Sequence, residues 1–231
     1  MKSIFIALLG LTVAACGSGK RPQKKVIDTS DLPANYYATE GWVSKTIELS
    51  VDMRATAKER SAIEKAVAVW NEAIGEELLQ ISTKDVSART AKELYETLTD
   101  DFNSIYYEPN FTATTKKEKT IIATTIWALK ADSSHIHAAD IIMNGEGYQF
   151  VDYADPSEST DAPEGMSKVD TETVLIHELG HLLGLAHVSE TVDSSSVMNP
   201  HITVDTPSTK RLLSPGDVEH VKNLYKSQQP E

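Results

Sequence analysis

The alternation of apolar and polar residues along the chain predicts where its regular elements lie. Between residues 47 and 53 every second residue is apolar, which is the period of a half-buried strand. Between Thr56 and Gly75 the apolar residues instead fall on one stripe at helical spacing. Thr56 and Glu59 have the spacing of a capping box, and Gly75 is a residue type that ends helices. These features predict a strand followed by a long helix.

Weaker patterns after this helix predict shorter elements. Residues 79–81 predict a short strand, and a capping pattern that begins at Thr90 predicts a lesser helix. Residues 104–119 are polar and irregular, and they predict no element. Residues 121–128 and 138–143 are rich in strand-forming and apolar side chains, and they predict two further strands.

Residues 145–170 show no strong period and predict an acidic loop. Its acidic side chains are Asp152, Asp155, Glu158, Asp161 and Glu164. Two interpretations are open, a solvated loop or a calcium site. The ligand order of a known calcium-binding loop is absent, so the sequence favours the solvated loop and does not support calcium.

The N-terminal residues have the pattern of an export signal. Lys2 precedes an apolar run from Ile4 to Ala15, which is shorter than the roughly 20 residues that a membrane-spanning helix needs. Residues 13–16 resemble a bacterial lipobox, so we expect residues 1–15 to be removed and Cys16 to be lipidated. The alternative is a plain secretory signal that discards this cysteine, and both interpretations export the protein.

Residues 16–40 predict a flexible tether between the lipidated cysteine and a folded domain. The segment is rich in small and basic residues, and Pro22 and Pro33 interrupt any helix. We expect a protein of the bacterial cell envelope, anchored in the membrane by its lipid and facing the periplasm or the cell surface. Gly17 takes the place of the aspartate that signals retention in the inner membrane, which favours the outer membrane where the cell has one.

Composition and charge exclude several classes of protein. The 231 residues include 22 Lys and Arg against 34 Asp and Glu, for a formal net charge of -12. This acidic balance argues against a nucleic acid partner, because binding to phosphates needs clustered positive charge. One cysteine cannot close an intramolecular disulfide, and 40% hydrophobic residues are enough for the core of one domain. We expect a monomer.

The residues that carry chemistry are concentrated between 177 and 187. His177 and His181 lie four residues apart, so on a helix both imidazoles face one side and can bind one cation. Gly184 can end that helix by adopting a positive φ, which lets His187 approach as a third ligand. Three nitrogen ligands leave one position of a tetrahedral zinc ion open for water, as in catalytic sites. Glu178 lies beside that position and can act as a general base.

The full motif from His177 to His187 resembles that of the metzincin metallopeptidases. The resemblance continues at residues 196–200, where Met198 matches the methionine of the family's Met-turn. A helix that opens shortly after this turn is similar to the final helix of the matrixins, and by that resemblance Asp217 hydrogen-bonds near the Met-turn. The likeness extends over residues 42–225.

This resemblance implies an α+β fold in layers, a twisted, mostly parallel five-stranded sheet backed by two long helices. A small C-terminal subdomain would hold the Met-turn and the final helix. The catalytic domain is expected over residues 41–227, followed by a tail over 228–231. An extended polypeptide substrate would add as a strand at the sheet edge. Pro200, His201 and Ile202 match the region of the family's specificity pocket.

We therefore expect a zinc metalloendopeptidase with one catalytic zinc ion that cleaves extracytoplasmic proteins or peptides. Val188 stands where matrixins usually carry serine, and no tyrosine lies two residues after Met198, so the subfamily stays open. Two alternatives stay open as well. One is a non-catalytic binding lipoprotein with the same fold, and the other is a peptidase that acts on peptidoglycan peptides.

Overall fold

The computed structural model of the protein describes residues 26–28, 38–44, 46–86, 102–130, 133–155, 157, 161–207 and 210–226. The expected signal peptide, the expected lipidation site at Cys16, the lesser helix at Thr90 and the expected C-terminal tail lie outside these residues. Among the described residues, no helix combines the length and the apolar character needed to cross a membrane.

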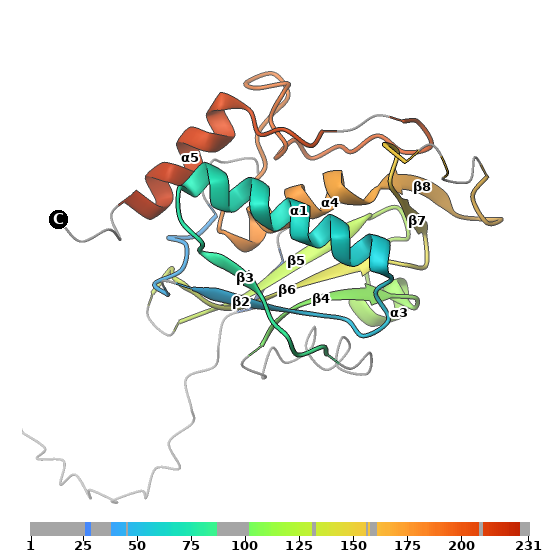
Figure 1. Ribbon diagram of the computed structural model, residues 1–231, viewed down its shortest axis with the longest axis horizontal. Helices are drawn as coiled ribbons and strands as arrows, with labels where there is room; N and C mark the ends of the chain where they lie inside the picture. The colour runs from blue at the N-terminus through green and yellow to red at the C-terminus, as the bar shows by residue number, and fades with distance from the viewer. Residues whose placement is uncertain are drawn as a thin grey trace, which may run out of the picture.

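A six-stranded sheet forms the centre of the fold, in the order β1-β5-β6-β4-β2-β3 (Figure 1). Its strands are β1 (Val26–Asp28), β2 (Ile47–Val51), β3 (Leu79–Ile81), β4 (Asn103–Glu108), β5 (Ala123–Leu129) and β6 (Ile136–Asn144). Strands β3, β2, β4 and β6 are parallel to one another, whereas β5 pairs antiparallel with β6. These five strands confirm the predicted, mostly parallel sheet.

Strand β1 was not expected, because it lies within the predicted tether. It pairs antiparallel with β5, with Val26 opposite Ala128 and Asp28 opposite Ile126. Part of the segment before the domain is therefore an edge strand of the sheet and not a flexible spacer.

Helices cover both faces of this sheet, and the helices of residues 57–74 and 171–182 lie on the same face (Figure 1). Helices α1 (Ala57–Ile74) and α4 (Thr171–Leu182) pack against each other and share the main apolar core with the sheet. Helix α3 (Phe111–Thr115) contributes Phe111 to a second core with Ile126 and Ile142. These two residues alternate along β5 and β6 with residues of the main core, so α3 lies on the opposite face. Helix α5 (Pro215–Lys226) packs against α1.

Helix α1 has the ends that its sequence predicts. The Thr56 hydroxyl accepts the Glu59 N–H at 3.2 Å, and the Glu59 carboxylate accepts the Thr56 N–H at 2.7 Å. Gly75 ends the helix with φ 89°, a left-handed conformation that favours glycine. Because the apolar stripe of α1 is buried against α4 and the sheet, α1 helps to fix the position of α4, which contains His177 and His181.

The structure corrects the sequence analysis at residues 104–119, which contain β4 and α3. Strand β4 lies between β2 and β6, and Tyr106 and Tyr107 are buried in the two different cores. A strand that is covered on both faces has no solvent side and therefore no clear alternation of polar residues. Its position in the sheet is set by pairing partners that are distant in the sequence.

Two smaller corrections concern the predicted acidic loop and the first strand. Residues 145–170 contain β7 (Tyr148–Val151) and β8 (Ser167–Asp170), which pair in parallel as a separate two-stranded sheet. Strand β7 is mostly half-buried, so its hydrophobic pattern is weak. Met53, which was predicted on the strand of residues 47–53, lies beyond the end of β2 and is 63% exposed.

Candidate metal centre

Helix α4, which carries two of the three histidines, is buried along its whole length and held at both ends. At its N-terminus the Asp170 carboxylate accepts hydrogen bonds from the N–H of Thr173 (3.0 Å) and from its hydroxyl (2.8 Å). Arg211 donates to both oxygens of Asp170, through Nε at 2.9 Å and Nη2 at 2.5 Å. This ion pair compensates the charge of a carboxylate that is completely buried.

All three tryptophans of the chain donate an indole N–H to a backbone carbonyl of α4. The last four carbonyls of a helix have no partner within the helix, so the indole donors to His181 and Leu182 fix the C-terminal end of α4. The pairs are Trp70 with Ile176 (2.9 Å), Trp127 with His181 (3.0 Å) and Trp42 with Leu182 (2.7 Å), and the Tyr225 hydroxyl adds a bond to Leu183 (2.7 Å).

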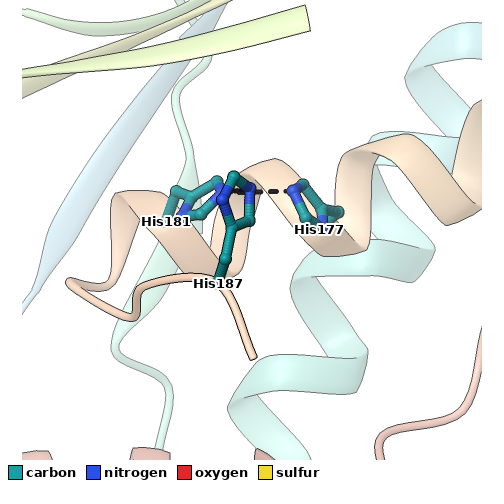
Figure 2. Close-up of side chains that lie close together, drawn as sticks. All are labelled: His177, His181 and His187. Atoms are coloured by element: carbon teal, nitrogen blue, oxygen red, sulfur yellow. Dashed lines mark hydrogen bonds between the residues drawn. The ribbon is translucent and has the colours of Figure 1, made fainter. Parts of the chain in front are cut away.

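Three histidine nitrogens converge beside α4 (Figure 2). The Nε2 atom of His181 lies 3.1 Å from Nε2 of His177 and 3.1 Å from Nε2 of His187. Two nitrogens bound to one tetrahedral zinc ion, each at about 2.0–2.1 Å, lie about 3.3 Å apart. The spacing of the three nitrogens therefore fits one zinc ion.

Backbone carbonyls orient two of these imidazoles. Nδ1 of His177 lies 2.8 Å from the Val197 carbonyl oxygen, and Nδ1 of His181 lies 2.8 Å from that of Leu185. Because a carbonyl can only accept, each Nδ1 carries the hydrogen and each Nε2 of the neutral ring turns a lone pair toward the centre.

Burial favours the neutral form of the three imidazoles, which is the form that binds a metal. Burial, and then repulsion from His187, lowers the pKa of His177 to about 4. Burial is also the largest cause that lowers the pKa of His181 well below its ordinary value and, to a smaller extent, the pKa of His187.

A turn at Gly184 brings His187 back to the helix. Gly184 has φ 106°, and a Cβ at this position would lie 2.5 Å from the Thr39 hydroxyl oxygen. Its carbonyl accepts the N–H groups of Ala38 at 2.9 Å and Thr39 at 3.3 Å. Residues 38–39, which lie between β1 and β2, thus hold the turn that places the third histidine.

Glu178 lies beside the triad and lines the same cavity. Its side chain is nearly buried, and Thr125 of β5 donates its hydroxyl to Glu178 Oε2 at 2.6 Å. A carboxylate next to three metal ligands can exchange a proton with a water molecule in the cavity.

Met198 lies in a tight turn that packs against α4 next to the triad. It is buried, and a Cβ on Gly180 would lie 2.3 Å from its sulfur, so the glycine permits this close approach. Asp217 of α5 accepts the Ser196 hydroxyl at 2.5 Å and the Val197 N–H at 2.9 Å. Since the Val197 carbonyl accepts from His177, this turn connects the C-terminal helix to the triad.

The cavity next to the triad has a volume of about 250 Å³. Its lining residues are Thr120, Ile121, Ile122, Ala123, His177, Glu178, His181, His187, Pro200 and Ile202. Two of the three residues expected at a specificity pocket, Pro200 and Ile202, therefore lie there. His201 does not line the cavity, because its side chain is 84% exposed and faces Glu190 with Nδ1 3.5 Å from Oε1.

Sequence reasoning missed several residues that support the site. Thr125 and Trp127 have the side chains of ordinary strand residues, so nothing in their pattern distinguishes them. Lys210, in a loop, donates its ammonium group to Asn199 Oδ1 (2.5 Å) and to the carbonyl of Ser194 (3.0 Å), which braces the Met198 turn.

Comparisons with known proteins agree with this geometry. The sequence profile of the family described as matrixin matches residues 42–226. "Metalloendoproteinase 2-MMP" of Arabidopsis thaliana is 47% identical over 57 residues, which cover 25% of this chain and 14% of that protein. "Metalloendoproteinase 1" of Glycine max is 40% identical over 60 residues, which cover 26% of this chain and 18% of that protein. The chain thus matches less than a fifth of the length of either relative.

Proposed function

This chain belongs to the matrixin family of zinc-dependent metallopeptidases, and on that premise we propose that it is an endopeptidase that cleaves extracytoplasmic proteins or peptides. The observation that carries the proposal is the convergence of three histidine nitrogens beside the Glu178 carboxylate in one open cavity. A structural zinc site has four protein ligands, whereas this site offers three and leaves room for water and a substrate carbonyl.

The residues of the site have separate tasks in this proposal. His177, His181 and His187 would hold one zinc ion, which when bound polarises the scissile carbonyl and lowers the pKa of water. Glu178 accepts a proton from the attacking water and then delivers it to the leaving amine. Within the described residues, the three histidines are the one group of three or more His, Cys, Asp or Glu side chains whose ligand atoms lie close enough together to hold a metal ion.

We infer that the substrate binds in an extended conformation along β5. An extended peptide can add main-chain hydrogen bonds to an exposed sheet edge. Strand β1 pairs with residues 126–128 of β5, so Ala123–Thr125 are the part of this strand edge that β1 leaves open. Ala123 of this part lines the cavity. Ile121, Ile122 and Ile202 line the cavity with aliphatic side chains, which favours an apolar substrate side chain beside the cut.

The test is cleavage of a peptide library by a soluble form that starts at residue 17, with cut sites identified by mass spectrometry. We expect Glu178→Ala to abolish every cut while zinc remains bound, because no metal ligand changes, and we expect a zinc chelator to abolish the cuts of the wild type. Glu219→Ala, which removes an exposed carboxylate on α5, is the control and should retain full activity.

The same experiment separates the alternatives. Peptidoglycan peptides added to the library would reveal a cell-wall enzyme by preferential cleavage. If the folded, zinc-loaded wild type cuts no peptide at all, the endopeptidase proposal is contradicted and the non-catalytic binding lipoprotein becomes the better interpretation.

We further propose that the protein is a lipoprotein of the bacterial cell envelope, anchored through Cys16. The support is the apolar run that ends in a lipobox-like sequence. Residues 17–25, which separate Cys16 from β1, can span at most about 30 Å, so the domain would work near the membrane surface. Cys16→Ala should move the protein from the membrane fraction to the soluble fraction, whereas Ser18→Ala should not. Equal membrane retention of both variants would contradict lipidation.

A further inference from the structure

Thr125 is a buried residue of β5 that contacts the proposed general base. Its side chain is completely buried, and Oγ1 lies 2.6 Å from Glu178 Oε2 and 3.2 Å from the Glu178 backbone oxygen. A threonine hydroxyl has one hydrogen to donate, and both of these oxygens accept. The shorter contact is the one to the carboxylate, and a hydrogen bond to a charged acceptor is the stronger type.

The position of Thr125 in the strand directs this hydroxyl toward α4. Side chains alternate between the two faces of a strand, and Ala123 and Trp127 lie with Thr125 on the face that packs against α4. The Trp127 indole reaches the His181 carbonyl of the same helix, at 3.0 Å. Strand β5 therefore holds α4 at two positions, at Glu178 through Thr125 and at His181 through Trp127.

We propose that Thr125 is a positioning residue for the reaction, because it holds Oε2 of Glu178, a residue that lines the cavity beside the three histidines. This inference rests on the proposed peptidase function. A glutamate side chain that rotates adopts many conformations in which its carboxylate is not placed to accept the proton from water. The β-branch of threonine restricts its own rotation, so the hydroxyl is a rigid support.

The test compares Thr125→Val, which keeps the shape and removes the hydroxyl, with Thr125→Ser, which keeps the hydroxyl. A hydrogen bond to a charged group corresponds to about a ten- to hundredfold change, so we expect kcat of Thr125→Val to fall by this factor. KM and the zinc content should stay within about twofold of the wild type, since the variant alters neither the histidines nor the aliphatic lining. Thr125→Ser should retain most of kcat.

Thr115→Val is the matched control, because Thr115 is also buried but donates its hydroxyl to the Phe111 carbonyl within α3, on the opposite face of the sheet. Its kcat should stay within about twofold of the wild type. An equal loss of kcat in Thr125→Ser and Thr125→Val would overturn the proposal.

A second measurement does not depend on activity. Crystal structures of the variants should show the Glu178 side chain held in Thr125→Ser and rotated or spread over several positions in Thr125→Val. An unchanged Glu178 in Thr125→Val would overturn the positioning role even if the protein cleaved no peptide. If Thr125→Val does not fold, Thr125→Ala removes the same hydroxyl and should give the same two results.

Discussion

At the scale of single residues, Gly180 determines how closely the turn that contains Met198 approaches α4. A Cβ here would lie 2.3 Å from the Met198 sulfur and 2.9 Å from the Trp70 ring, both shorter than real carbon contacts. We expect Gly180→Ala to lower the free energy of unfolding by about 1–3 kcal/mol through overpacking. It should also weaken zinc binding, because the turn carries the carbonyl that orients His177. Denaturant unfolding and zinc titration measure the two effects.

A double-mutant cycle isolates the contact. Met198→Ala removes the sulfur that the new Cβ would meet, so Gly180→Ala should cost less in that background than in the wild type. The rescue should be partial, because the Trp70 contact remains. Additive losses would show that the Met198 sulfur is not what limits position 180.

Zinc binding at the three histidines should also be visible in thermal stability. A ligand that binds only the folded protein stabilises it by about 2.7 kcal/mol at a free concentration 100 times its Kd. We therefore expect zinc to raise Tm and a chelator to reverse the rise. His187→Ala, which removes one ligand, should abolish most of the response. His201→Ala, which alters an exposed histidine outside the cavity, should keep it, and a normal response of His187→Ala would place the ion elsewhere.

At the scale of elements, the N-terminus of α4 depends on an ion pair with a distant loop. Arg211 is the arginine that faces the completely buried Asp170, and it also bonds to Asp152. Arg211→Ala leaves the Asp170 charge without this partner, so we expect a loss of about 3–5 kcal/mol in the free energy of unfolding.

Arg60→Ala is the control for this prediction, because Arg60 pairs with Asp85, whose side chain is 45% exposed. Such pairs contribute about 1 kcal/mol or less. Urea denaturation of both variants measures the difference, and equal losses would mean that the position of Arg211 next to a buried carboxylate has no special importance.

At the scale of the whole molecule, β1 covers part of the edge along which we propose that the substrate binds. Only peptides long enough to reach residues 126–128 of β5 would compete with β1 for main-chain hydrogen bonds. A soluble form that starts at residue 29 should therefore have a lower KM for such long peptides than one that starts at residue 17. For short peptides the two forms should be equal, and an equal KM for long peptides would show that the substrate does not use this part of β5.

The sequence by itself determined the features that depend on neighbours in the chain. The cap at Thr56, the glycine stop at Gly75 and the four-residue spacing of His177 and His181 are local, because helical hydrogen bonds and faces repeat every few residues. The family resemblance then supplied the mostly parallel sheet that the structure confirms. Local pattern and family motif together were enough to identify the three histidines and Glu178.

Only the tertiary structure decided what these residues contact. Thr125 meets Glu178, and Arg211 meets Asp170, across stretches of chain that no local pattern connects. Strand β4 lies in the sheet although its sequence is not periodic, because β2 and β6 pair with its two edges and the two cores cover its two faces. Pairing between distant segments depends on where the rest of the chain has packed, so the histidines of the candidate metal centre could be found from the sequence but the residues that support them could not.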